Sequence, residues 1–133
     1  MKILIADDNY ASRKLLKAYL EPHGECTFAH DGGETLQLVT AALDAGEPFD
    51  LLCLDIMMPE LDGSEALKRI RALEMERNIE KEKRLKVIMV TALDGRKDII
   101  RLFNDGCEGY LIKPIDAGKL NRVLVQLGLI ADS

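Results

Sequence analysis

The sequence predicts an α/β fold: a doubly wound, five-stranded parallel sheet flanked by five helices. Short apolar runs alternate along the chain with segments in which apolar residues recur every three to four positions, the pattern of βαβ units. Residues 51–54, Leu-Leu-Cys-Leu, form a continuous apolar run, as expected of a strand buried on both faces of a parallel sheet. With 133 residues, no internal repeat and no linker, the chain is expected to form one domain over residues 1–133.

The composition is that of an ordinary globular protein, with 47% hydrophobic and 31% charged residues. A net charge of −5 argues against direct nucleic-acid binding. No apolar stretch approaches the ~20 residues needed to cross a bilayer, and the chain opens into a strand rather than a signal peptide. The three cysteines lack metal-ligand spacing and indicate reduced, mostly buried thiols, while both histidines are interpreted as surface residues. We therefore expect a cytoplasmic protein without membrane contact.

The first half of the chain contains two strands and two helices before the central apolar run. Residues 2–6 form the first strand, and a helix follows to about residue 21, where Pro22 and Gly24 end it. The second strand covers residues 26–29, and the next helix covers residues 35–45. The inner sides of these two helices are expected to carry Leu15, Leu16, Tyr19 and Leu20, and Leu36, Val39, Thr40 and Leu43, respectively.

The second half continues the alternation. Ser64 is a good N-cap for the third helix, whose expected buried stripe comprises Ala66, Leu67, Ile70 and Leu73. Strands are expected at residues 86–90 and 109–112, each followed by a helix, at about 95–104 and 116–127. The segment 75–84 is rich in charges of both signs. Such a run is typical of a solvated helix end or loop, and we assign it no function.

Polar residues follow four of the five predicted strands: Asp7 and Asp8, Asp55, Thr91, and Lys113 before Pro114. Each has an ordinary structural interpretation. The acids after the first strand are typical N-caps of a helix, the threonine is a candidate cap for the fourth helix, and the lysine suits a solvated loop. Parallel strands, however, bring these ends to one edge of the sheet, where open α/β folds carry their chemistry. The coincidence at four strand ends favours a functional site.

The chemistry that fits these residues is phosphoryl transfer to a carboxylate. Three acids in one pocket repel one another and require a divalent cation with oxygen ligands, and Mg²⁺ suits a site with few carboxylates. The Lys113 ammonium and the Thr91 hydroxyl are suited to stabilising the charge on a transferring phosphoryl group. Asp55 is then the nucleophile, and its product is an acyl phosphate.

These motifs resemble those of two-component response-regulator receiver domains, and the resemblance covers essentially the whole chain. It implies the flavodoxin-like strand order 2-1-3-4-5. The segments that carry it are Ile5-Ala6-Asp7-Asp8-Asn9, Leu54-Asp55-Ile56-Met57-Met58-Pro59, Asp62-Gly63, Val90-Thr91-Ala92 and Gly109-Tyr110-Leu111-Ile112-Lys113-Pro114.

The resemblance implies a role for each matching residue. Asp55 is the phosphoacceptor, Asp7 and Asp8 are metal-binding acids, and the backbone carbonyl of Met57 completes the Mg²⁺ site. The other matches are the hydroxyl residue Thr91, the phosphoryl-pairing lysine Lys113, the switch aromatic Tyr110, and Pro114, usually preceded by a cis peptide bond.

The resemblance also implies partners. A sensor histidine kinase or a phosphotransfer protein supplies the phosphoryl group, and a downstream effector binds the face formed by the fourth helix, fifth strand and fifth helix. Dimerisation on phosphorylation is a further implication. The domain catalyses its own phosphorylation and dephosphorylation rather than turning over an external substrate. Two features depart from the family pattern, the long charged segment 75–84 and Asp105 at a position that is commonly small.

Three other classes share part of this pattern. A flavodoxin-like cofactor binder requires a hydroxyl- and glycine-rich phosphate cradle, whereas Asp7 and Asp8 repel a phosphate. A phosphatase of the haloacid dehalogenase type requires an acid two residues after the nucleophile, where this chain has Met57. A receiver-like interaction module that works without phosphorylation remains the alternative, and intact acids, Thr91 and Lys113 argue against it.

Overall fold

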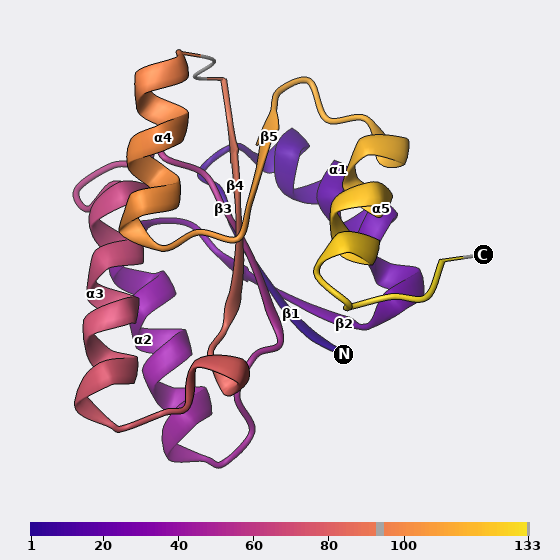
Figure 1. Ribbon diagram of the computed structural model, residues 1–133. Coiled ribbons are helices and arrows are strands. Elements are labelled where there is room, and N and C mark those ends of the chain that lie inside the picture. Colours follow the sequence, from indigo (N-terminus) through magenta and orange to yellow (C-terminus); the bar gives the residue numbers. More distant parts are fainter. Residues whose placement is uncertain (93–94, 133) are drawn as a thin grey trace.

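A single five-stranded parallel sheet forms the centre of the computed structural model, which describes residues 1–92 and 95–132. The strand order is β2-β1-β3-β4-β5 (Figure 1), so the predicted order is confirmed. The registers of all four neighbouring pairs are parallel. The strands are β1 (Lys2–Ala6), β2 (Glu25–Ala29), β3 (Leu51–Leu54), β4 (Lys86–Thr91) and β5 (Gly109–Ile112).

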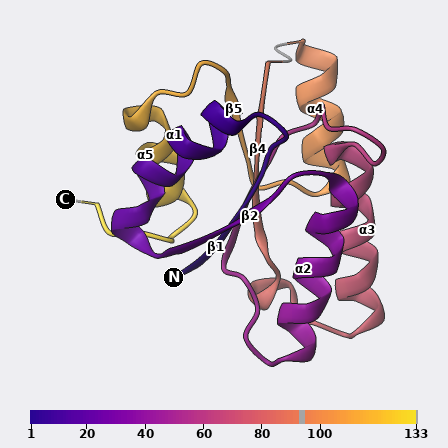
Figure 2. The same ribbon diagram turned by 180° about the vertical axis from the view of Figure 1, so that it is seen from behind.

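Helices cover both faces of the sheet, as Figures 1 and 2 show from opposite sides. One face carries α1 (Tyr10–Leu20) and α5 (Ala117–Gln126), and the other carries α2 (Gly32–Asp44), α3 (Gly63–Glu76) and α4 (Arg96–Asp105). Two short 3₁₀ helices, η1 (Glu21–His23) and η2 (Lys81–Lys83), lie between these elements. The doubly wound prediction is therefore confirmed.

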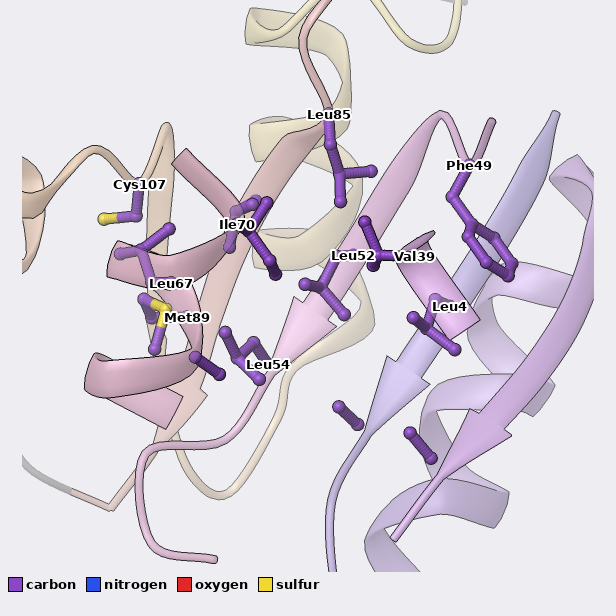
Figure 3. Close-up of a cluster of buried hydrophobic side chains, with 14 of the residues drawn as sticks. Leu4, Val39, Phe49, Leu52, Leu54, Leu67, Ile70, Leu85, Met89 and Cys107 are labelled. Atoms are coloured by element: carbon purple, nitrogen blue, oxygen red, sulfur yellow. The ribbon is translucent and has the colours of Figure 1, made fainter. Parts of the chain in front are cut away.

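The sheet separates two hydrophobic cores because successive strand side chains point to opposite faces. On the face of α2, α3 and α4, Leu4, Leu52 and Met89 are fully buried (Figure 3). On the face of α1 and α5, Ile3, Leu51 and Ile88 are fully buried. Because both faces are covered, the inner strands carry continuous apolar runs.

Several predicted helix boundaries were wrong by a few residues. The N-cap of α3 is Asp62, whose carboxylate accepts a hydrogen bond from the Glu65 amide at 2.9 Å, so Ser64 lies inside the helix. The N-cap of α2 is Asp31, and that helix begins at Gly32 rather than Thr35. The end of α1 at Leu20 agrees with the predicted end near residue 21, and Pro22 lies in η1.

The buried side of α1 also differs from the prediction. Leu15 is 38% exposed, whereas Arg13 is buried together with Leu16 and Leu20. Positions 13, 16 and 20 fit the helical period, so the buried face is rotated about the helix axis relative to the predicted one. The guanidinium of Arg13 donates to the backbone carbonyl of Asp7.

A partly buried ionic network, centred on the buried Glu74 and not indicated by the sequence pattern, ties α3 to the segment before β5. The Arg71 guanidinium donates to the Gly106 and Leu85 carbonyls and pairs with Glu74 at 2.7 Å and Glu108 at 2.8 Å. Glu74 also accepts a 2.7 Å hydrogen bond from the Leu85 amide. The charged residues from Met75 to Lys83 are largely exposed, as expected, but this network fixes both ends of that segment.

The cysteines and histidines agree with the sequence interpretation in most respects. Cys53 and Cys107 are buried, Cys26 is half-buried, and all three thiols are free. His30 is exposed, whereas His23 is half-buried. Within the described residues, every helix is too short or too polar to cross a membrane.

Candidate functional site

The carboxyl edge of the sheet gathers the acids that the sequence singled out. Asp7 and Asp8 follow β1, and Asp55 follows β3, the neighbouring strand. One carboxylate oxygen of each lies within 4.8 Å of the other two. Asp7 and Asp55 are buried, with 1% and 5% of their surface exposed, whereas Asp8 is exposed. The predicted convergence of the three acids is therefore observed.

Backbone hydrogen bonds extend the sheet one residue beyond its strands and fix these side chains. The Asp7 amide donates to the Ala29 carbonyl at 3.1 Å, and the Asp55 amide donates to the Ala6 carbonyl at 2.9 Å. On the other side of the site, the Lys113 amide donates to the Thr91 carbonyl at 2.8 Å. The site is thus a continuation of the parallel ladder, which explains why strand ends alone located its residues.

Lys113 reaches both buried acids. Its Nζ atom lies 2.8 Å from Oδ2 of Asp7 and 3.1 Å from Oδ2 of Asp55. The peptide bond between Lys113 and Pro114 is cis, as the family resemblance implied. One ammonium therefore faces two buried carboxylates, with the third acid exposed beside them.

Further contacts hold the two buried acids in place. Oδ1 of Asp7 accepts a 2.9 Å hydrogen bond from the Asn9 amide, and Oδ1 of Asp55 accepts a 3.2 Å hydrogen bond from the Met57 amide. The buried Arg13 guanidinium donates to the Asp7 carbonyl at 2.8 Å. Sequence analysis missed this positioning residue, and its only signal was the helical spacing from Leu16 and Leu20.

The loop after Asp55 is packed too closely to admit a side chain at Gly63. A Cβ atom at that residue would lie 2.1 Å from the Asp55 carbonyl oxygen, which no packing adjustment accommodates without moving backbone. The Gly63 amide donates to the Ile56 carbonyl at 2.9 Å. This glycine therefore lets the start of α3 lie directly against the backbone of the site.

The pKa values of Asp55 and Lys113 are both raised, and for each group the contributions of burial and of neighbouring charges differ in sign. Burial, reinforced by the Asp7 carboxylate, raises the pKa of Asp55 above its ordinary value, although the nearby Lys113 ammonium lowers it in part. Burial lowers the pKa of Lys113, but its hydrogen bond to Asp7 and the charge of Asp55 outweigh burial and raise the pKa overall. Lys113 is therefore a firmly protonated cation at neutral pH.

The remaining predicted site residues lie on the neighbouring strands and the β3–α3 loop. Thr91 is fully buried at the last position of β4, so it does not cap α4, whose N-cap is Gly95. Tyr110 on β5 is half-buried and packs against the core shared with α2, α3 and α4. Met57 is 62% exposed, so its side chain lies at the rim of the site.

The geometry suits a hard divalent cation and a phosphoryl group. Carboxylate oxygens are the ligands that Mg²⁺ prefers, and a few of them leave coordination positions for water or phosphoryl oxygen. A lysine ammonium beside these acids suits the charge of a phosphoryl group. The fold and site therefore define a doubly wound α/β domain with a candidate cation site and a lysine at the carboxyl edge of its sheet.

The chain belongs to the response regulator receiver domain family, whose sequence model matches residues 3–125. It is thus homologous to the receiver domains of two-component signalling proteins. A structural neighbour is the receiver domain of a Francisella response regulator, with a TM-score of 0.75, 32% identity and 96% coverage of both chains.

Two further relatives are histidine kinases or sensor proteins. The receiver domain of the histidine kinase CKI1 from Arabidopsis thaliana, solved in complex with Mg²⁺ and BeF₃⁻, is 30% identical with a TM-score of 0.75, covering 92% of this chain and 88% of that one. The sensor protein GacS of Pseudomonas syringae pv. syringae is 35% identical over 127 residues, which are 94% of this chain. The chain spans only 13% of the length of that curated relative.

Proposed function

We propose that this chain is a phosphoacceptor in a two-component system, taking a phosphoryl group onto Asp55 in the presence of Mg²⁺. The observation that carries this proposal is the buried Asp55 carboxylate, which lies beside the Asp7 and Asp8 carboxylates and 3.1 Å from the Lys113 ammonium. The donor is a phosphohistidine of a sensor histidine kinase or phosphotransfer protein, or a small phosphodonor such as acetyl phosphate. We propose that the chain acts in the cytoplasm.

The reaction forms one bond and breaks one. A carboxylate oxygen of Asp55 attacks phosphorus, the bond from phosphorus to the donor nitrogen or oxygen breaks, and the donor retains that electron pair. Asp7, Asp8, Asp55 and the Met57 carbonyl would hold Mg²⁺, which supplies positive charge to the phosphoryl oxygens when bound. Lys113, already protonated, would exchange its contact with Asp55 for one with the phosphoryl group.

Phosphorylation then changes the face formed by α4, β5 and α5. The Thr91 hydroxyl moves towards the phosphoryl group, and Tyr110, two residues before the end of β5, turns inward. Ile100 and Phe103 of α4 and Ile112 of β5 are 54%, 45% and 45% exposed. Exposed apolar side chains on neighbouring elements suit a protein partner, either an effector or a second phosphorylated copy.

Incubation with acetyl phosphate and Mg²⁺, followed by intact-protein mass spectrometry, tests the proposal. The native protein should gain the mass of one phosphoryl group, and Asp55→Asn should gain none because the amide is not a nucleophile. The exposed Asp44→Asn, outside the site, is the matched control and should label as the native chain does. Equal labelling of Asp55→Asn would place the acceptor elsewhere. A native chain without label would favour an interaction module that works without phosphorylation.

A further inference from the structure

A second candidate binding site lies at the opposite edge of the sheet, where the strands begin. It is an apolar cavity of about 240 Å³ between α2, the segment before β3 and the segment before β4. Val39 and Leu43 come from α2, Phe49 precedes β3, and Ile79 and Leu85 flank η2. Figure 3 shows Val39, Phe49 and Leu85 at the end of the core where the strands begin. The site around Asp55 uses none of these residues.

The charged segment between α3 and β4, to which the proposed function assigns no role, builds one wall of this cavity. Glu74 is 2% exposed and lines the cavity, and it fixes the segment at two points. Its backbone carbonyl accepts from the Ile79 amide at 3.0 Å, and its carboxylate accepts from the Leu85 amide at 2.7 Å. Arg71 donates to the other carboxylate oxygen at 2.7 Å. Both carboxylate oxygens of Glu74 therefore have hydrogen-bond partners within the protein.

Positive charge lies at the edge of this apolar space. Lys83 lines the cavity and also an adjoining pocket that shares Pro48 and Phe49 with it. That pocket carries three cationic and two acidic side chains in a protein whose net charge is −5. One of the acids, Asp50, already accepts a 2.7 Å hydrogen bond from the Lys2 amide. In the described part of the chain Lys83 has no salt bridge.

We propose that this cavity binds a small amphipathic carboxylate, with its hydrocarbon part among Val39, Leu43 and Leu85 and its carboxylate at Lys83. An apolar cavity of about 150 Å³ suffices for benzene, and a volume of 240 Å³ holds roughly eight water-sized groups. The ligand is therefore a chain of roughly six to eight carbons or a single substituted ring. Apolar pockets with few polar groups at the rim are the usual form of small-molecule sites.

Titration of isotopically labelled protein with sodium octanoate, followed by NMR, tests this proposal. Saturable shifts should appear at the methyl groups of Val39, Leu43, Ile79 and Leu85. Octylamine has the same chain and the opposite charge, and it should bind more weakly than octanoate. Lys83→Gln should weaken octanoate binding roughly two- to five-fold, the range of an exposed ion pair. The matched control is Lys119→Gln on α5, the helix on the other face of the sheet, and it should leave octanoate binding unchanged.

Two cavity-filling variants complete the test. Ile79→Trp should abolish the octanoate shifts while Asp55 still accepts a phosphoryl group from acetyl phosphate, which reports that the fold is intact. Leu43→Phe provides a second filling variant on the opposite wall if the first does not fold. The proposed site would be disproved by octanoate shifts that do not saturate or that lie outside the cavity. Unaltered octanoate binding in either folded variant would disprove it as well. Equal binding of octylamine and octanoate would overturn the role of Lys83.

Discussion

Lys113 lies closer to Asp7 than to Asp55: its ammonium nitrogen is 2.8 Å from the Asp7 carboxylate and 3.1 Å from that of Asp55. This single cation therefore divides its charge between two buried acids, while the exposed Asp8 adds a third negative group. Among the described residues the site therefore has three carboxylates and one ammonium, so the negative charge exceeds the positive charge. The metal-free site is therefore electrostatically incomplete, and its properties should depend on pH and on divalent cations.

The first prediction concerns the stability of the metal-free protein as a function of pH. Burial raises the pKa of Asp55 above its unfolded value. The carboxyl group therefore costs stability increasingly as the pH rises from the unfolded pKa, and the full cost is present above the folded pKa. In chelator at pH 7, Asp55→Asn should therefore be more stable than the native chain by about 1 kcal/mol, the usual size of a single-residue effect. The advantage should shrink as the pH falls through the folded pKa and vanish below the ordinary value near 3.8.

Urea unfolding at a series of pH values measures this difference. Asp44→Asn removes an exposed acid whose partner is Arg77 and should show no comparable gain at neutral pH. A less stable Asp55→Asn protein at pH 7 would mean that the contact with Lys113 outweighs burial.

The second prediction concerns the proposed switch. Beryllofluoride with Mg²⁺ should shift the amide NMR signals of Thr91 and Tyr110 and those of α4, because the phosphoryl mimic draws the hydroxyl and frees space for the ring. Thr91→Ala should still take label from acetyl phosphate but should lose the α4 shifts. Unchanged α4 and β5 signals in a native protein that is fully labelled would disprove the switch and leave the acceptor role of Asp55 intact.

The sheet and most of the site could be predicted from the sequence because each depends on a one-dimensional pattern. Buried parallel strands are continuous apolar runs, and their ends share one edge of the sheet, so the strand pattern alone predicts that Asp7, Asp55 and Lys113 lie together. The backbone ladder that continues past the strands then fixes them in the site. Helix starts were less predictable because Asp62 and Ser64 are both good caps, and only the hydrogen bond to the Glu65 amide distinguishes them.

Buried charges were the part that the pattern could not reveal. Arg13 and Arg71 lie on helices that also carry exposed cations, Lys14 and Arg69 respectively, and an arginine in such a helix is ordinarily solvated. Both guanidinium groups donate to backbone carbonyls: Arg13 reaches the Asp7 carbonyl, and Arg71 reaches that of Gly106, which lies 35 residues away. Such partners become visible only in three dimensions.

The third prediction concerns that buried network. Arg71→Met should lower the free energy of unfolding by about 3–5 kcal/mol, because it leaves the buried Glu74 carboxylate without its cation. Arg69→Met, on the same helix, removes an exposed pair with Glu65 at 3.3 Å and should cost less than about 1 kcal/mol. Urea unfolding of both variants gives the comparison. Replacing Glu74 by Gln in the Arg71→Met background should recover part of the loss, and equal losses in the two single variants would contradict a buried network.

The last prediction is that Mg²⁺ stabilises the folded chain before any phosphoryl group arrives. Asp7, Asp8 and Asp55 offer oxygens within 4.8 Å of one another, and carboxylates that close repel one another at neutral pH. A cation that binds the folded site but not the unfolded chain adds about 1.4 kcal/mol at ten times its Kd, which should raise the melting temperature by several degrees in a domain of this size. The effect should appear in melting curves recorded with saturating Mg²⁺ and with chelator.

The Asp8→Asn variant distinguishes the stability gained from Mg²⁺ binding from the stability lost through repulsion among the carboxylates. Asp8 is the exposed member of the three and has no ion pair in the described residues, so its replacement removes a ligand and a repelling charge without unpairing Lys113. The variant should melt higher than the native chain in chelator and should respond less to Mg²⁺. Asp44→Asn, an exposed acid outside the site, should keep the full Mg²⁺ response. If the native chain is indifferent to saturating Mg²⁺, or if Asp8→Asn is the less stable protein in chelator, the three acids do not act as one site.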